Sequence, residues 1–324
     1  MGGTTDGRGM ETDILGGQFL RRTIDLGTDD EGPVVATLVS RKADAPTGRA
    51  VLYVHGYVDY FFQEHLAEFY VERGIDFYAL DLRKYGRSLL PHQTPNFVRS
   101  ISEYFPELDE AARIIREEDG HRRLLVNAHS TGGLITALWA HRVRDAGIVD
   151  GLFMNSPFFE INVPPMQRRT VGPVVDALAR VRPYARVRAS VSMAYGHSIH
   201  ATHHGEWNYN LAWKPLESFP VRAAWLAAIR SAQARLHAGL SIPVPVLVAC
   251  STRSFRGTSW TEAAMHADAV LDVEHIAHYS SRLGRHVTIV RIDGGLHDLT
   301  LSAPPVRAQV FAELDRWIGA YIPD

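Results

Sequence analysis

The 324 residues include only one cysteine, Cys250, so an internal disulfide framework is excluded. A lone cysteine suits a reducing compartment, and the first residues lack the apolar core of a signal peptide, so we expect a cytoplasmic protein. No apolar run approaches the length of about 20 residues that spans a membrane. The net charge is only -2, which gives no electrostatic reason to expect binding to nucleic acid or to an anionic membrane.

Internal repeats are also absent, and the pattern that is present is an alternation of strands and helices. Apolar runs that predict strands occupy residues 18–26, 33–40, 50–55, 77–81, 124–127, 151–155, 244–250 and 286–292. The alternation predicts an α/β fold with a mostly parallel sheet and helices on both faces. The rhythm breaks over residues 157–242, which we expect to form an inserted helical cap. The cap would sit on a core of residues 13–156 and 243–324, which follows a flexible tail at 1–12.

Ser130 lies in the most informative segment, Ala128-His-Ser-Thr-Gly132. An apolar run ends just before it and a helical pattern follows, which predicts a strand, a sharp turn and a helix with the serine at the apex. Such a turn holds the hydroxyl out over the end of the sheet, and small residues on either side let the backbone pass close to its neighbours. Glycine is usual at the first position, where this chain has Ala128. We predict that Ser130 is a nucleophile.

The serine needs a base, because its hydroxyl is a weak nucleophile until a histidine accepts the proton. His297 stands on a glycine-bearing loop between the last predicted strand and the last helix, so we predict that it is this base. His121 and His141 fall on helix ends or faces. His129 is expected to point away from Ser130 because of its place in the turn.

An acid must hold the histidine in the right tautomer, and it should follow the strand at 244–250. We predict Asp268 for this role. Asp272 directly precedes a helical pattern and makes a good N-cap, and Glu262 is a weaker rival. The loop at 251–262 is longer than is usual at this place, which leaves the alternatives open.

Two backbone N–H groups are expected to stabilise the oxyanion that forms during acyl transfer. One belongs to Thr131, the residue after the nucleophile. The other is predicted at Tyr57, because His55-Gly-Tyr57 follows the strand at 50–55 and Gly56 allows a close approach of the backbone. The Tyr57 side chain is expected to pack rather than to line a pocket.

Four motifs carry a family resemblance: Val54-His-Gly-Tyr57, Asp81-Leu-Arg-Lys-Tyr-Gly-Arg-Ser88, Ala128-His-Ser-Thr-Gly-Gly133 and Gly295-Leu-His-Asp298. Together they resemble the capped α/β-hydrolases of the monoacylglycerol lipase and lysophospholipase-like group, often labelled serine aminopeptidase S33-like. Lys84 stands where that group has a glycine. The segment that begins at Asp268 is similar to the one that carries the group's acid. The resemblance implies an α/β-hydrolase fold and hydrolysis of an ester through an acyl-enzyme.

The expected cap is the part that would select the substrate. Trp207 and Trp213 are candidates for lining the pocket, where they would suit an acyl chain or an aromatic ester, and packing within the cap is the alternative. Four histidines gather nearby, namely His197, His200, His203 and His204. A metal site is the alternative to a structural role for them. Because no carboxylate or cysteine pattern accompanies them, we expect no metal and no cofactor.

Three functions are compatible with these residues. A serine hydrolase that cleaves a lipid-like or small acyl ester is favoured, with a small-molecule ester as its partner. An aminopeptidase-type peptidase would need cap carboxylates to hold a free amine, whereas this cap is rich in arginine and histidine. A non-hydrolytic lyase or a ligand-binding member could keep the same residues, because the fold alone does not decide function. Dehalogenases and epoxide hydrolases need an aspartate in the place of Ser130.

Overall fold

The computed structural model describes residues 9–163, 165–187, 193–257 and 259–323. Across these residues nine strands form one sheet in the order β1-β2-β3-β5-β4-β6-β7-β8-β9. The strands are β1 (Met10–Thr12), β2 (Leu20–Asp29), β3 (Gly32–Arg41), β4 (Arg49–Val54), β5 (Ile75–Asp81), β6 (Arg123–His129), β7 (Gly151–Asn155), β8 (Val246–Ser251) and β9 (Val287–Ile292). The β1–β2, β2–β3 and β3–β5 pairings are antiparallel. The other pairings, from β5 to β9 in sheet order, are parallel.

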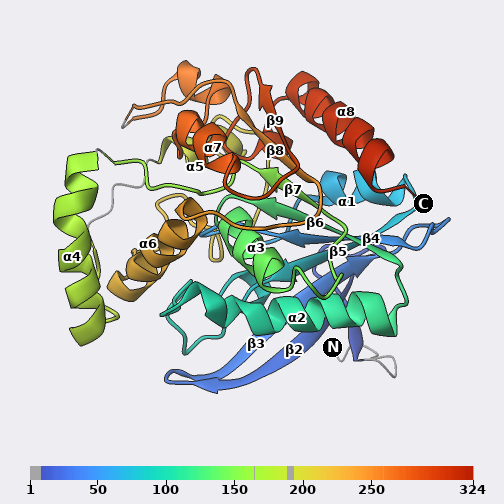
Figure 1. The fold of residues 1–324 in the computed structure, drawn as a ribbon, viewed down its shortest axis with the longest axis horizontal. Coiled ribbons are helices and arrows are strands. Elements are labelled where there is room, and N and C mark those ends of the chain that lie inside the picture. The colour runs from blue at the N-terminus through green and yellow to red at the C-terminus, as the bar shows by residue number, and fades with distance from the viewer. Residues whose placement is uncertain (1–8, 164, 188–192, 258, 324) are drawn as a thin grey trace.

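Helices cover both faces of the sheet (Figure 1). On one face, α1 (Glu64–Val71) and α8 (Pro304–Tyr321) bury their apolar sides against the strands. On the other face lie α2 (Phe105–Arg113), α3 (Thr131–Arg142), α6 (Ala223–His237) and α7 (Val273–Ser280). Short turns of helix occupy η1 (Gly86–Ser88), η2 (Ile101–Tyr104), η3 (Ile114–Glu118), η4 (Glu262–His266) and η5 (Leu299–Leu301). The predicted fold class is confirmed.

The edge strand β1 differs from the expected flexible tail. Met10 to Thr12 pair with Arg22 to Leu20 of β2, so these three residues belong to the sheet. Pairing satisfies backbone groups that the edge of β2 would otherwise present unpaired. The rest of the tail, residues 1–8, lies outside the described residues.

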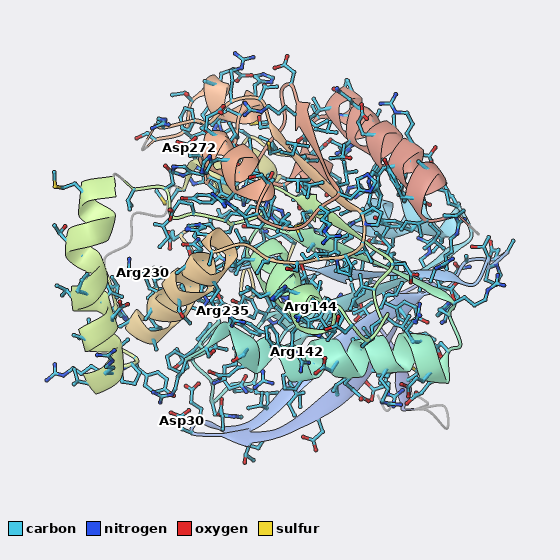
Figure 2. All side chains as sticks on the ribbon, viewed as in Figure 1. Asp30, Arg142, Arg144, Arg230, Arg235 and Asp272 are labelled. Carbon is cyan, nitrogen blue, oxygen red and sulfur yellow. The ribbon has the colours of Figure 1, made fainter. Side chains whose placement is uncertain are left out.

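The insertion, residues 156–245 between β7 and β8, contains α4 (Pro165–Val181), α5 (Ala194–Ile199) and α6. In Figure 1, α4 stands at the outside and packs on α6. Arg230 of α6 reaches towards α4 and pairs with Asp176 at 3.4 Å (Figure 2). The other side of α6 contacts α3, and its buried Trp225, Ile229 and Leu236 join the main core. The last helix of the segment expected as a cap therefore packs as part of the layer that flanks the sheet.

No helix in the described part of the chain has both the length and the apolar character needed to cross a membrane.

Candidate active site

Ser130 sits at the turn between β6 and α3 with φ 51° and ψ -117°, a conformation that is strained for a residue with a side chain. Its backbone N–H donates to the carbonyl oxygen of Asn155 at 3.0 Å. A Cβ at Gly132 would lie 2.5 Å from the carbonyl oxygens of Val54 and His55, so only glycine fits there. Ala128 is buried within β6. The sharp turn expected at the end of this strand is present.

His297 and Asp268 complete a chain of hydrogen bonds that starts at Ser130. His297 Nε2 lies 3.0 Å from Ser130 Oγ, and His297 Nδ1 lies 2.9 Å from Asp268 Oδ2. The other oxygen of Asp268 accepts from the backbone N–H groups of Val270 and Leu271, both at 2.8 Å. These bonds turn Oδ2 towards the imidazole. All three predicted residues are buried, with exposed fractions of 7%, 3% and 0% in the order Ser130, His297, Asp268.

The two rival acids lie elsewhere. Asp272 lies at the start of α7 (Figure 2). It caps this helix by accepting from the backbone N–H of Glu274 at 3.1 Å, and it pairs with Arg256. The Glu262 side chain is 80% exposed. The long loop before them folds back, because the Phe255 N–H donates to the Asp268 carbonyl oxygen at 2.7 Å. Among the described residues, Asp268 is the acid that the structure places against His297.

Asp298, which the sequence analysis did not select, anchors the loop that carries His297. Its Oδ1 accepts from Asn155 Nδ2 at 2.7 Å and from Thr300 Oγ1 at 2.7 Å, and its Oδ2 accepts from Gln63 Nε2 at 3.2 Å. Burial opposes ionisation, yet nearby His129 and the hydrogen bonds from Thr300 and Asn155 hold the pKa of Asp298 below its usual value. The signals in the sequence were its position beside His297 and the polar end of the strand at Asn155.

The loop after β4 brings the predicted oxyanion residue Tyr57 to the nucleophile. A Cβ at Gly56 would lie 3.0 Å from Ser130 Cβ, so the backbone here passes close to the serine. Tyr57 and Thr131 both lie in the wall of the cavity at Ser130. The Tyr57 ring packs on Trp225 with centroids 4.0 Å apart. Tyr57 therefore packs on a neighbouring ring and also belongs to the wall of the cavity, which the sequence analysis had treated as alternatives.

A cavity of about 220 Å³ opens beside Ser130 and His297. Much of its wall is apolar, including Ile161, Ile199, Leu216, Val221 and Leu226. Its Phe, Tyr and Trp residues are Tyr57, Phe158, Tyr195, Tyr209 and Trp225. Neither Trp207 nor Trp213 is among the described residues that line it. Trp207 stacks on His65 and donates to the Leu301 carbonyl oxygen at 2.8 Å, and Trp213 packs its edge on Tyr60. Both tryptophans join the insertion to the core instead.

The histidines of the insertion pack mainly with rings. His197 stacks on His203 with centroids 4.1 Å apart, and His204 stacks on Trp260 at 3.3 Å. His200 Nδ1 lies 2.8 Å from Thr202 Oγ1. Over the described ranges, no three side chains of histidine, cysteine, aspartate or glutamate gather in a way that could hold a metal ion.

His129 lines the same cavity as Ser130 and lies next to the base. Its Nδ1 donates to the carbonyl oxygen of Asn155 at 3.1 Å, and its ring centroid is 4.8 Å from that of His297. Burial lowers the pKa of His129 to about 4, and neighbouring His297 adds to this effect. The imidazole beside the base is therefore neutral at physiological pH.

The strand order and the two helical layers are those of an α/β-hydrolase. Within this class, the family described as serine aminopeptidase, S33, matches residues 45–302, and the chain belongs to that family. The fold resembles a soluble variant of monoglyceride lipase from Saccharomyces cerevisiae, with a TM-score of 0.66 and 14% identity over 93% of this chain and 96% of that one. A comparison with curated proteins gives no significant match.

Two further solved structures share the fold. The monoacylglycerol lipase of Paleococcus ferrophilus aligns with a TM-score of 0.64 and 17% identity, over 88% of this chain and 99% of that one. A thermostable carboxyl esterase from Bacillus coagulans, solved with glycerol, aligns with a TM-score of 0.66 and 13% identity, over 93% of this chain and 99% of that one. At these identities the likeness concerns the fold.

Proposed function

We propose that the protein is a serine hydrolase that cleaves a carboxylic ester through an acyl-enzyme. The observation that carries the proposal is the continuous hydrogen-bond chain from Ser130 Oγ through His297 to Asp268, with distances of 3.0 and 2.9 Å. These distances are short enough for direct proton transfer from the hydroxyl to the imidazole. The series of hydrogen bonds ends at the buried carboxylate of Asp268, which suits the acid of such a triad.

In this mechanism each residue has one role. His297 Nε2 accepts the proton of Ser130 as Oγ attacks the ester carbonyl carbon, and it then gives the proton to the leaving alcohol. Asp268 holds the proton on Nδ1 and stabilises the imidazolium that forms. The backbone N–H groups of Tyr57 and Thr131 hold the oxyanion. A water molecule, activated by His297 in the same way, then releases the acid and restores the hydroxyl.

The substrate class follows from the cavity and from the structural neighbours. The largely apolar wall suits an acyl chain or an aromatic ring. The three aligned neighbours are a monoglyceride lipase, a monoacylglycerol lipase and a carboxyl esterase, which supports an ester over an amide. A lipid-like or small acyl ester is the substrate that this cavity fits.

The aminopeptidase activity in the family's description is the second candidate. It would need a free carboxylate to hold the amine of a peptide. The wall of the cavity has one carboxylate among the described residues, Asp59, and this is already paired with Lys214 at 2.5 Å. Turnover of an aminoacyl amide at a rate comparable to that of esters would favour this second function.

Covalent labelling tests the proposal. A fluorophosphonate probe should label the wild-type protein at Ser130, and Ser130→Ala should lose the label and at least ~10³-fold in turnover of nitrophenyl esters. Ser218→Ala is the matched control, because Ser218 lines the same cavity and should leave the label in place. Labelling that persists in Ser130→Ala would contradict the assignment. A series of nitrophenyl esters of rising chain length would then measure the acyl preference.

A further inference from the structure

Three polar side chains form a cluster in the cavity wall, which we call the polar cluster: Asp59, Tyr195 and Lys214. Asp59 follows Tyr57 on the loop after β4, while Tyr195 and Lys214 come from the insertion. Lys214 Nζ donates to Asp59 Oδ1 at 2.5 Å. Both charged residues are more than nine-tenths buried, with exposed fractions of 2% for Asp59 and 6% for Lys214. Such deep burial of an ion pair beside a nucleophile calls for a physical reason.

The polar cluster has hydrogen-bonding capacity that the protein does not use. Asp59 Oδ2 and Tyr195 Oη are buried without a hydrogen-bond partner among the described residues. The Lys214 ammonium has three N–H groups, and the hydrogen bond to Asp59 occupies one of them. Buried polar atoms are normally paired, so an acceptor and donors left open in one wall indicate a missing partner.

The polar cluster also lies beside the reacting groups. The Tyr195 ring packs its edge on His297, with centroids 5.3 Å apart and planes at 86°. The Lys214 ammonium is surrounded by the rings of Phe62, Tyr195 and Tyr209 at 5.4 to 5.8 Å. Burial raises the pKa of Tyr195 well above its ordinary value, so its hydroxyl remains a neutral donor. The polar cluster, Ser130 and His297 line the same cavity.

The chemistry of the missing partner follows from the two opposite charges. A carboxylate would be repelled by Asp59, and an ammonium group would be repelled by Lys214. An apolar group would leave Asp59 Oδ2, the Tyr195 hydroxyl and the remaining N–H groups of Lys214 unpaired. A hydroxyl group can accept from Lys214 or Tyr195 and donate to Asp59 Oδ2 at the same time.

We propose that the polar cluster binds a neutral hydroxyl group on the substrate ester, and that this hydroxyl determines specificity. The inference rests on the proposed function, because it places the hydroxyl on an ester that Ser130 attacks. The size of the cavity favours a compact substrate. A cavity of about 150 Å³ in another protein holds benzene, and this one has about 220 Å³.

Two matched pairs of esters test the proposal and locate the hydroxyl. The acyl pair is 4-nitrophenyl butyrate and 4-nitrophenyl 3-hydroxybutyrate. The alcohol pair is propyl butyrate and 3-hydroxypropyl butyrate, and its hydrolysis is measured by titration of the released acid. In at least one pair, kcat/KM of the hydroxylated ester should exceed that of its parent by about tenfold or more, since sites built for a hydroxyl reject the analogue that lacks it. The pair that shows the preference identifies the side of the scissile bond.

Tyr195→Phe is the decisive variant, because it removes the unpaired hydroxyl without breaking a hydrogen bond seen among the described residues. It should lower the preference for the hydroxylated ester about fivefold. Tyr184→Phe is the matched control, because the Tyr184 hydroxyl donates to Asp30 and lies outside the cavity wall, so the preference should remain. A preference below about twofold in both pairs, or one that Tyr195→Phe leaves intact, overturns the proposal while the esterase function stands. If none of the four esters is cleaved and no serine is labelled, the proposed function itself fails.

Discussion

The Asn155 side chain donates to Asp298 Oδ1 at 2.7 Å, while the Asn155 carbonyl oxygen accepts from the backbone N–H of Ser130 at 3.0 Å. Asn155 Oδ1 also accepts from the backbone N–H of Leu299 at 3.1 Å. One residue at the end of β7 therefore holds both the turn that carries the nucleophile and the loop that carries the base. The distance between Ser130 and His297 depends on this junction.

Asn155→Ala should impair catalysis more than its effect on folding would suggest. The backbone bond to Ser130 persists, but the loop of His297 loses two hydrogen bonds and the base can shift. A displacement of about 1 Å at reacting groups can cost about 10²-fold in rate, so kcat should fall about 10- to 100-fold. Measurements of kcat and of the melting temperature check this prediction.

Asn127→Ala provides the control for that experiment. Asn127 is as deeply buried in the neighbouring strand β6, and its amide donates to the Tyr70 hydroxyl at 3.1 Å rather than to the histidine loop. This variant should lose about 1–3 kcal/mol of stability, as expected for a broken buried hydrogen bond, and keep most of its kcat. An equal loss of kcat in both variants would contradict a specific role for Asn155.

Asp268→Asn should lose about 10²–10⁴ in kcat. The asparagine oxygen can still accept from the N–H groups of Val270 and Leu271, which turns its NH₂ towards His297 and favours the wrong tautomer. Asp272→Asn should stay near wild type, since asparagine also caps a helix, and so should Glu262→Gln. The three kcat values, taken beside melting temperatures, decide the assignment. An inactive, well-folded Asp272→Asn protein would move the acid to that residue.

Much of the fold could be predicted because its signals are local. Apolar runs in the sequence mark the buried parallel strands, and the run expected at 77–81 is β5, Ile75–Asp81. Ser130 was identifiable because the strained turn needs small residues at fixed positions. His297 could be selected among sixteen histidines by its place between the last strand and the last helix.

The features that the sequence did not reveal depend on contacts between distant segments. The hydrogen bond from Gln63 to Asp298 spans 235 residues, and no periodicity encodes such a pairing. The aromatic residues of the insertion could face the cavity or the core with the same local pattern. Trp225 lines the cavity, whereas Trp207 packs on His65. Tertiary packing, rather than composition, makes that choice.

Lys84 occupies a left-handed conformation with φ 63°, a region of backbone conformation that favours glycine. Its buried ammonium pairs with Asp29 at 2.5 Å and with Glu31 at 2.6 Å on the hairpin of β2 and β3. Lys84→Met should cost about 2–3 kcal/mol of unfolding free energy, because it leaves partly buried carboxylates unpaired. The measurement is urea unfolding at neutral pH.

Asp30 lies on the same hairpin (Figure 2). Its exposed ion pair with Arg99 provides the comparison. Its side chains are 47% and 48% exposed, so solvent screens the attraction. Arg99→Met should cost at most about 1 kcal/mol. If Lys84→Met is no more destabilising than Arg99→Met, the prediction that the buried ion pairs of Lys84 stabilise the fold is wrong.

His129 should make the folded state sensitive to acid. Its pKa is lowered to about 4, mainly by burial, whereas a histidine in an unfolded chain has a pKa of about 6.5. As the pH falls from about 7 towards 4, the unfolded chain binds a proton that the folded protein does not, so the free energy of unfolding decreases. Between pH 7.5 and pH 5 the decrease for this one group is about 2 kcal/mol, and above pH 7.5 it vanishes. His129→Gln removes the group, so the stability difference between wild type and variant should shrink by about that amount on going from pH 7.5 to pH 5. Urea unfolding at the two pH values measures the difference, and parallel losses in both proteins would show that His129 takes up a proton equally well when folded.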